Sequence, residues 1–360
     1  MSENCKRLKK IRGSMNQDEP NMKVIIFILI IASVISITLA IGIGPISVQP
    51  IMVAKIILSK LPFLANSISP TWEQLDENIV WGLRLPRVLL GMIVGASLAV
   101  TGVAMQALIR NHLADPFILG VSSGASATAT LGMLFGVFGF LGTYSLSISA
   151  FIGAAATIII VYTISRVKGR INITHLLLAG VVIAMIMDAI TNIITLSAPN
   201  ALGLHNAAFW MSGSLAGAKW GYLKLPFIVV IVCLIFLMIN YRALNALLLG
   251  DEAAVTLGIN VANMQKILIL VASLLAGVTI AVSGSIGFIG LIVPHMTRLF
   301  VGSDHRRVLP VSALLGGILV VWTDVVARLV IAPEELPIGI LTALIGGPFF
   351  IWLLKRNSKA

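Results

Sequence analysis

Two adjacent acids, Asp251 and Glu252, stand in a short segment of mixed polarity that lies between long apolar runs at 223–240 and 267–282. The segment favours a short helix, and a membrane chain has little use for one at its surface unless another protein docks on it. We therefore expect residues 247–261 to form a docking loop for a separate subunit. Its central residues are Gly250, Asp251, Glu252, Ala253, Ala254 and Gly258.

Other combinations of reactive residues predict little chemistry. The five histidines are scattered, with no pair at i,i+4 spacing, so a zinc site is not expected. The sequence has no Gly-x-x-x-x-Gly-Lys-[Ser/Thr] loop that would cradle a nucleotide phosphate. No nucleophile, base and acid form a recognisable set. We expect no catalytic residue, no metal and no cofactor in this chain.

The composition is that of an integral membrane protein. Of the 360 residues, 58% are hydrophobic and 11% are charged, whereas soluble domains carry about 25% charged residues. The net charge of +11 does not indicate nucleic-acid binding, because bases gather beside apolar runs, where they act as orientation signals. Two cysteines, Cys5 and Cys233, give no disulfide framework. The terminal bases are Lys6, Arg7, Lys9, Lys10, Arg12, Lys23, Lys355, Arg356 and Lys359.

The apolar runs predict about ten transmembrane helices in an all-α fold. The first run is about 20 residues long, enough to cross a bilayer, and it lacks a clear cleavage site, so we expect it to be retained. Most bases then fall on the side of the two termini, which we place in the cytoplasm. The sequence divides into a basic tail at 1–23, one membrane domain at 24–354 and a second tail at 355–360. The expected spans are 24–43, 84–108, 118–137, 146–165, 174–197, 222–240, 265–283, 286–301, 308–331 and 338–354.

A weak internal repeat is visible in the sequence. Ala99-Val100-Thr101-Gly102 ends one apolar run, and Ala281-Val282-Ser283-Gly284 ends another. If spans 2–5 match spans 7–10, the offset of five spans makes the repeats inverted, which is a transporter feature. The alternative is chance similarity between helices rich in glycine and alanine.

The segment 252–258, Glu-Ala-Ala-Val-Thr-Leu-Gly, resembles the cytoplasmic coupling loop of permeases in ATP-binding-cassette (ABC) importers. Further motifs follow in order along most of the chain, from about residue 84 to 354. Together they are similar to the FecCD-type permeases of type II ABC importers, which import iron–siderophores, haem and vitamin B12. The motifs are Arg84-Leu85-Pro86-Arg87, the run 110–116 (RNHLADP), the run 210–215 (WMSGSL), the run 287–295 (GFIGLIVPH), Asp304-His305-Arg306, Asp324 to Arg328, and Glu335-Leu336-Pro337-Ile338-Gly339.

This resemblance implies a set of partners. They are a second permease, identical or paralogous, two cytosolic ATPases that hold the ATP and Mg, and an extracytoplasmic solute-binding protein. Arg84, Arg87 and Arg328 match the family's outer arginines that dock the binding protein. Their alternative role is interfacial snorkelling. Asp324 stands one helical turn before Arg328 and could neutralise it.

The resemblance also suggests pathway residues. Asn111 and Leu113 match the family's inner gate, but His112 replaces the usual proline between them, and Thr174 is the nearest hydroxyl in the loop before span 5. Asp188 lies in the middle of span 5. An acid at that depth is a functional candidate: it could line a wet pathway, or it could be a packing residue that is protonated or bonded to Asn192.

We therefore predict a multi-pass permease of the cytoplasmic membrane that moves ferric siderophore by alternating access, with the energy supplied by a partner ATPase. Haem or cobalamin import within the same family is the first alternative. An ion-gradient-driven secondary transporter with Asp188 as its coupling acid is an alternative of another class. We expect the chain to contact the lipid membrane and to bind no nucleic acid.

Overall fold

The computed structural model describes residues 22–60, 72–167 and 170–357. The first long helix is α2 (Met22–Gly42). The remaining elements are α3 (Pro50–Ser59), α4 (Gln74–Glu77), η2 (Asn78–Arg84), α5 (Leu85–Ile109), η3 (Pro116–Leu119), α6 (Val121–Phe135), η4 (Gly139–Tyr144), α7 (Ser145–Ser165), β1 (Arg166–Val167), β2 (Arg170–Ile171), α8 (Ile173–Leu196), α9 (Ala201–Met211), α10 (Trp220–Ile239), α11 (Tyr241–Leu248), α12 (Asp251–Thr256), α13 (Val261–Ser283), α14 (Ile289–Val301), α15 (His305–Leu329) and α16 (Ile338–Asn357). The basic residues at 6–12 and Lys359 lie outside the described residues.

The structure confirms the predicted all-α membrane fold. Within the described ranges, eight helices are long and apolar enough to cross a membrane. The shorter helices α6 and α14 occupy the other two expected spans. Counted with α6 and α14, the ten expected spans are an even number and would place the two ends of the chain on one side of the membrane, as the charges predict. The one sheet formed by described residues is the antiparallel two-residue pair β1–β2, with Arg166 opposite Ile171.

Two spans differ from the expectation. The segment expected as a helix at 286–301 begins only at Ile289. Gly284 and Phe288 have positive φ values of 64° and 67°, which interrupt the helical conformation between α13 and α14. Thirteen residues rise about 20 Å, less than the roughly 30 Å of a bilayer core, so α14 does not cross on its own. Span 2, in contrast, begins earlier than expected, at Gln74, and runs unbroken to Ile109.

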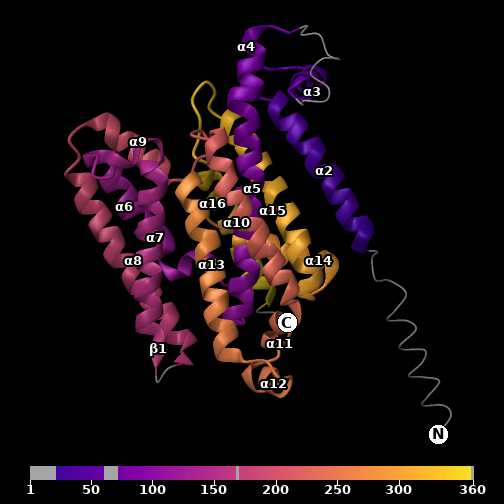
Figure 1. Cartoon of the computed structure of the whole chain (residues 1–360), viewed down its shortest axis with the longest axis vertical. Coiled ribbons are helices and arrows are strands. Elements are labelled where there is room, and N and C mark those ends of the chain that lie inside the picture. The colour runs from indigo at the N-terminus through magenta and orange to yellow at the C-terminus, as the bar shows by residue number, and fades with distance from the viewer. Residues whose placement is uncertain (1–21, 61–71, 168–169, 358–360) are drawn as a thin grey trace, which may run out of the picture.

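Helix α5 is the centre of the main bundle and packs against α10, α13, α14 and α15 (Figure 1). Glycines allow this close approach. A Cβ added at Gly95 would meet the Gly316 carbonyl of α15, and one added at Gly102 would meet the Gly290 carbonyl of α14. Small residues at such crossings let helix backbones touch in lipid, so these glycines set the distance between the helices.

Helices α6, α7 and α8 form a second group beside this bundle (Figure 1). The packing of α6 on α7 and α8 has a counterpart in the packing of α14 on α15 and α16. This is the neighbour pattern that the predicted repeat requires, while the inversion across the membrane stays a prediction. In α2, α8 and α16, only 22% of the most apolar 18-residue stretch of each helix is buried. The outer faces of these helices are therefore free to contact lipid or another subunit.

Candidate functional site: a cytoplasmic coupling surface and an outer arginine cluster

The predicted docking loop is a separate helical turn at one end of the molecule. Helix α12 projects at the end opposite to α4 and α9 (Figure 1). Gly250 before it and Gly258 after it have φ of 104° and 81°, where glycine is strongly favoured. Ala254 is fully buried and anchors the turn, whereas Asp251 and Glu252 are exposed. The six residues therefore present two acids outward from a fixed base.

An ion pair links this turn to the central helix. Arg110 closes α5 in the left-handed conformation, with φ 56°, and its Nη2 lies 2.6 Å from Oδ1 of Asp251. Both side chains are partly exposed, so the pair contributes little stability, at most about 1 kcal/mol. Its importance is positional, because it connects α12 directly to the helix around which the bundle packs. The sequence alone does not indicate this role for Arg110, although its position just beyond span 2 is compatible with it.

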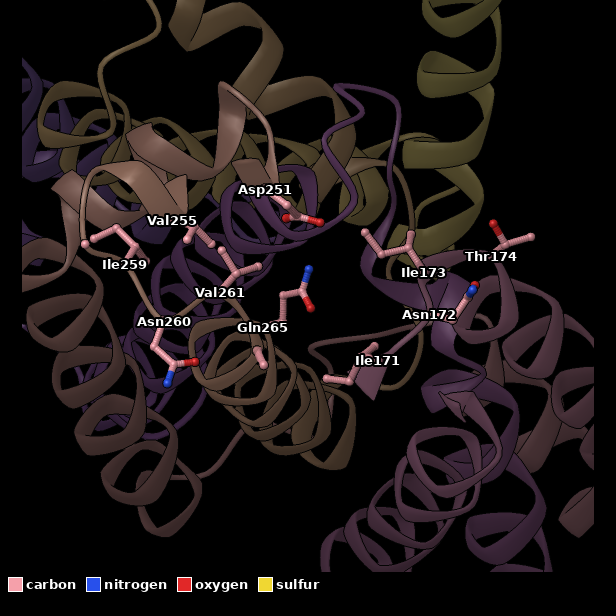
Figure 2. A pocket seen from close by; sticks show the side chains of 12 residues that line it. Ile171, Asn172, Ile173, Thr174, Asp251, Val255, Ile259, Asn260, Val261 and Gln265 are labelled. Carbon is pink, nitrogen blue, oxygen red and sulfur yellow. The ribbon is translucent and has the colours of Figure 1, made fainter. Parts of the chain in front are cut away.

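A cleft of about 770 Å³ opens between the docking turn and the start of α8. Figure 2 shows residues of the α12–α13 region on one side and of β2 and α8 on the other, with Asp251 and Gln265 directed into the space between them. The cleft brings together the predicted residues Thr174, Asp251 and Gly258. It also includes Gln265, which is 6% exposed and which the sequence did not single out, because one glutamine in an apolar helix carries no pattern.

The two edges of the cleft are fixed by helix caps. The Asn172 side chain accepts a hydrogen bond from the His175 amide at the start of α8, 3.0 Å away. Asn260 does the same for the Asn263 amide at the start of α13, also at 3.0 Å. Each cap satisfies a backbone donor that the first helical turn leaves free. The cleft therefore separates two well-formed helix starts.

The predicted inner-gate loop follows α5 directly. Asn111 Oδ1 accepts a hydrogen bond from the Leu113 amide at 2.9 Å, an Asx turn that holds the loop although His112 replaces the family's proline. Partial burial lowers the pKa of His112, and the charges of Arg298 and His295 act in the same direction. Neither Asn111 nor Leu113 lines the cleft beside Thr174. The loop reaches α8 instead through η3, where a Cβ at Gly180 would meet the Ile118 carbonyl.

Asp188 lies halfway along α8 on an exposed face. On the same side of the helix, the apolar side chains of Val181 and Met185 are also exposed. Among the hydrogen bonds of the described residues, none joins Asp188 to Asn192, so the Asn192-bonded alternative has no support within one protomer. A carboxyl at this depth is too costly to face lipid, which favours a position against a second subunit or a water-filled path.

The outer end of the molecule contains a buried arginine cluster. Arg87 donates to Asp324 Oδ1 at 2.8 Å through Nη2 and to Glu335 at 2.8 Å through Nη1. Arg328 Nε lies 3.1 Å from Asp324 Oδ2, as the sequence spacing predicted, and it also donates to the carbonyls of Ala40 and Ile43. Arg84 donates to the carbonyls of Ile41, Gly42 and Ile46 and has no carboxylate partner in the described chain.

These arginines are not interfacial snorkels. Arg84, Arg87 and Arg328 are 8%, 9% and 3% exposed, respectively. Together with Glu335 they form the polar wall of an outer cavity of about 390 Å³. Their role in docking a binding protein stays a prediction, and it would require groups of that protein to reach the arginines through this cavity.

The fold and these two surfaces define a membrane-embedded permease with a cytoplasmic docking turn. The chain belongs to the FecCD transport family, whose model matches residues 28–356. It is a permease subunit of an ABC importer in the cytoplasmic membrane, and it works with ATPase subunits, a binding protein and a second permease.

Three relatives are named for the transport of different cargoes. The chain is 42% identical to the hemin transport system permease protein HmuU of Yersinia pestis, over 82% of this chain and 90% of that protein. It is 39% identical to the vitamin B12 import system permease protein BtuC of Vibrio cholerae, over 80% and 86%. It is 38% identical to the Fe(3+) dicitrate transport system permease protein FecD of Escherichia coli, over 82% and 92%.

A solved ABC transporter of metal-chelate type, in an inward-facing conformation, superposes with a TM-score of 0.79 at 31% identity, covering 93% of this chain and 99% of that one. The likeness extends over nearly the whole fold.

Proposed function

We propose that this permease translocates ferric siderophore, and that a motion of the α12 turn drives the passage. The observation that carries the proposal is the exposed acid Asp188 in the middle of α8. A carboxylate on the pathway would attract a ligand rich in hydroxyl or cationic groups and repel the two carboxylates of haem. Haem or cobalamin import, which the relatives HmuU and BtuC represent, is the alternative within the family.

In the proposed cycle the loaded binding protein docks at the outer arginine cavity. ATP, with Mg, binds between two cytosolic ATPases and not to this chain. Each ATPase holds a groove into which α12 inserts, with Asp251 and Glu252 at its surface. The Arg110–Asp251 contact carries the motion of α12 into α5, and the cleft beside Thr174 opens or narrows as α8 and α13 move apart or together. The substrate crosses between two permease protomers, identical or paralogous.

The ligand class is tested by uptake in cells that lack the chromosomal copy of this permease. Wild-type chain on a plasmid should restore accumulation of radioactive iron supplied as a hydroxamate siderophore, and unlabelled siderophore should compete. Asp188→Asn should reduce this uptake, while the exposed-face control Ile193→Asn should leave it unchanged. Restoration of haem or cyanocobalamin uptake without siderophore uptake would refute the siderophore assignment and leave the permease assignment intact.

The ion-driven alternative depends on the same Asp188. A secondary carrier would take up substrate in liposomes that contain this chain alone with an imposed proton gradient. We expect no such uptake, because the docking turn indicates that the energy comes from a partner. Gradient-driven uptake lost in Asp188→Asn would support the carrier instead.

A further inference from the structure

A second cavity lies on the flank of the molecule, away from both functional surfaces. It has a volume of about 280 Å³ and lies between α7, α10 and α13. Its lining is almost wholly apolar and includes Ile148, Phe151, Leu225 and Val278. Leu225 is 63% exposed and Ile148 37%, so the cavity opens sideways, toward what surrounds the helices.

The outer rim of this cavity is aromatic and polar. Tyr144 and Tyr222 meet edge to face with ring centroids 5.7 Å apart, and the Tyr222 hydroxyl donates to the Thr143 carbonyl at 2.7 Å. Tyrosines of this kind are typical of the membrane–water interface, with rings in the apolar layer and hydroxyls at the headgroup level. Gly221 keeps the rim open, because a Cβ there would lie 3.0 Å from the Tyr144 hydroxyl.

Two lysines flank the same rim. Lys219 occupies the N-cap position of α10 and Lys224 lies five residues later, and both are exposed. Both are close in sequence to Gly221 and Leu225, which line the cavity, although neither lysine is part of the lining itself. Pro226, also in the lining, has no amide hydrogen, so the Tyr222 carbonyl lacks its usual helical donor. The start of α10 therefore carries two exposed cations at the same end of the helix as the apolar cavity.

We propose that this cavity binds one phospholipid of the outer leaflet, with an acyl chain between α7, α10 and α13 and an anionic phosphate beside Lys219 and Lys224. An empty apolar hole would forfeit dispersion contacts along its whole lining, and hydrocarbon is the material that surrounds an exposed membrane helix. A second copy of this chain fits the rim less well, because two lysine pairs would meet across a symmetric contact.

The lipid has a structural consequence for transport. It contacts α7 of the α6–α8 group on one side and α10 and α13 of the central bundle on the other. The cytoplasmic cleft lies between the same two groups of helices. A bound acyl chain would fill the space between the two groups and still let them move past each other, whereas a protein side chain in the same space would hold them in one position. Lipid bound in this cavity would therefore stabilise the packing of the two helix groups and still allow them to change their relative position.

Native mass spectrometry of the purified full-length chain tests the site, with phosphatidylglycerol added to lipid-depleted protein. We expect wild type to retain one phosphatidylglycerol per protomer. Filling the cavity with Ser147→Trp or, at an exposed and tolerant position, Leu225→Trp should weaken this binding at least tenfold. Ile159→Trp, on an exposed part of α7 outside the cavity, should bind like wild type.

The headgroup is tested separately. The double variant Lys219→Gln and Lys224→Gln should lose the preference for phosphatidylglycerol over phosphatidylcholine, while the same change at Lys55 of α3 should not. The proposal is overturned if both tryptophan variants retain the lipid as wild type does, or if Ile159→Trp loses it equally. It is also overturned if the tryptophan variants change the number of chains in the particle and leave the lipid count unchanged, since the cavity would then be a subunit contact.

Discussion

The outer arginine cluster depends on one carboxylate, Asp324. Its side chain is 2% exposed, and its two oxygens lie within 3.1 Å of nitrogens on both Arg87 and Arg328. Asp324→Asn keeps the shape but removes the negative charge between two buried guanidinium groups. Breaking a buried ion pair by neutralising one partner typically costs about 3–5 kcal/mol, because the remaining charge stays buried and uncompensated. Arg87 keeps its contact with Glu335, whereas Arg328 has no second carboxylate partner among the described residues, so we expect the lower part of that range.

The assay is equilibrium unfolding of the purified protein in mixed detergent and sodium dodecyl sulfate micelles. Glu335→Gln is the matched control. It also removes a carboxylate that contacts Arg87 at 2.8 Å, but its side chain is 29% exposed, so we expect a loss of about 1 kcal/mol. A triple variant that replaces Arg87, Asp324 and Arg328 by Met, Leu and Met should recover most of the loss, because apolar residues of similar volume do not require charge compensation.

The reasoning would be refuted if Asp324→Asn cost no more than Glu335→Gln. Such a result would mean that the carbonyl groups around Arg328 and water in the outer cavity compensate the arginines without the acid.

Three further predictions concern packing, capping and coupling. Gly95→Ala should cost at least about 1–3 kcal/mol through overpacking against α15, whereas Gly347→Ala, with open space around it, should not lower the melting temperature. Burial raises the pKa of Asp304, but hydrogen bonds from Asn245 and the Arg306 amide outweigh this effect and bring the pKa below its ordinary value. Asp304→Ala should therefore lower the free energy of unfolding by about 0.5–2 kcal/mol at neutral pH. This difference between the variant and wild type should shrink as the pH falls below about 4, through the pKa of Asp304 in the folded protein. Asp251→Arg should reduce ATP-driven uptake, and adding Arg110→Asp should restore part of it; no recovery in the double variant would show that the ion pair does not transmit the motion.

Long apolar runs were predictable because their signal is carried by composition over about 20 residues, and eight helices long enough to span confirm most of them. The positive φ of Phe288 was not predictable, because this backbone conformation is rare at a bulky residue and no motif in the sequence indicates it. The family was also predictable from the sequence, because several motifs in a fixed order are together far more specific to one family than any single motif.

Contacts between distant segments account for what the sequence could not show. The spacing of Asp324 and Arg328 predicted their pairing along one helix, but Arg87 lies 237 positions from Asp324 and joins them only through the packing of α5 on α15. Likewise Thr174 and Asp251 were separate predictions with separate roles, and the fold alone brings them to one cleft. The burial of the outer arginines follows from the same cause.

The most direct test of the central claim is iron–siderophore uptake by Glu252→Arg at matched membrane levels, together with co-purification of the ATPase. Glu252 is exposed on α12 and makes no contact that stabilises the helices among the described residues, so charge reversal should leave the protein folded. Glu252→Gln serves as the control for loss of charge alone. The account predicts that Glu252→Arg lowers uptake to the deletion background and releases the ATPase. Unchanged uptake with the ATPase still bound would contradict it.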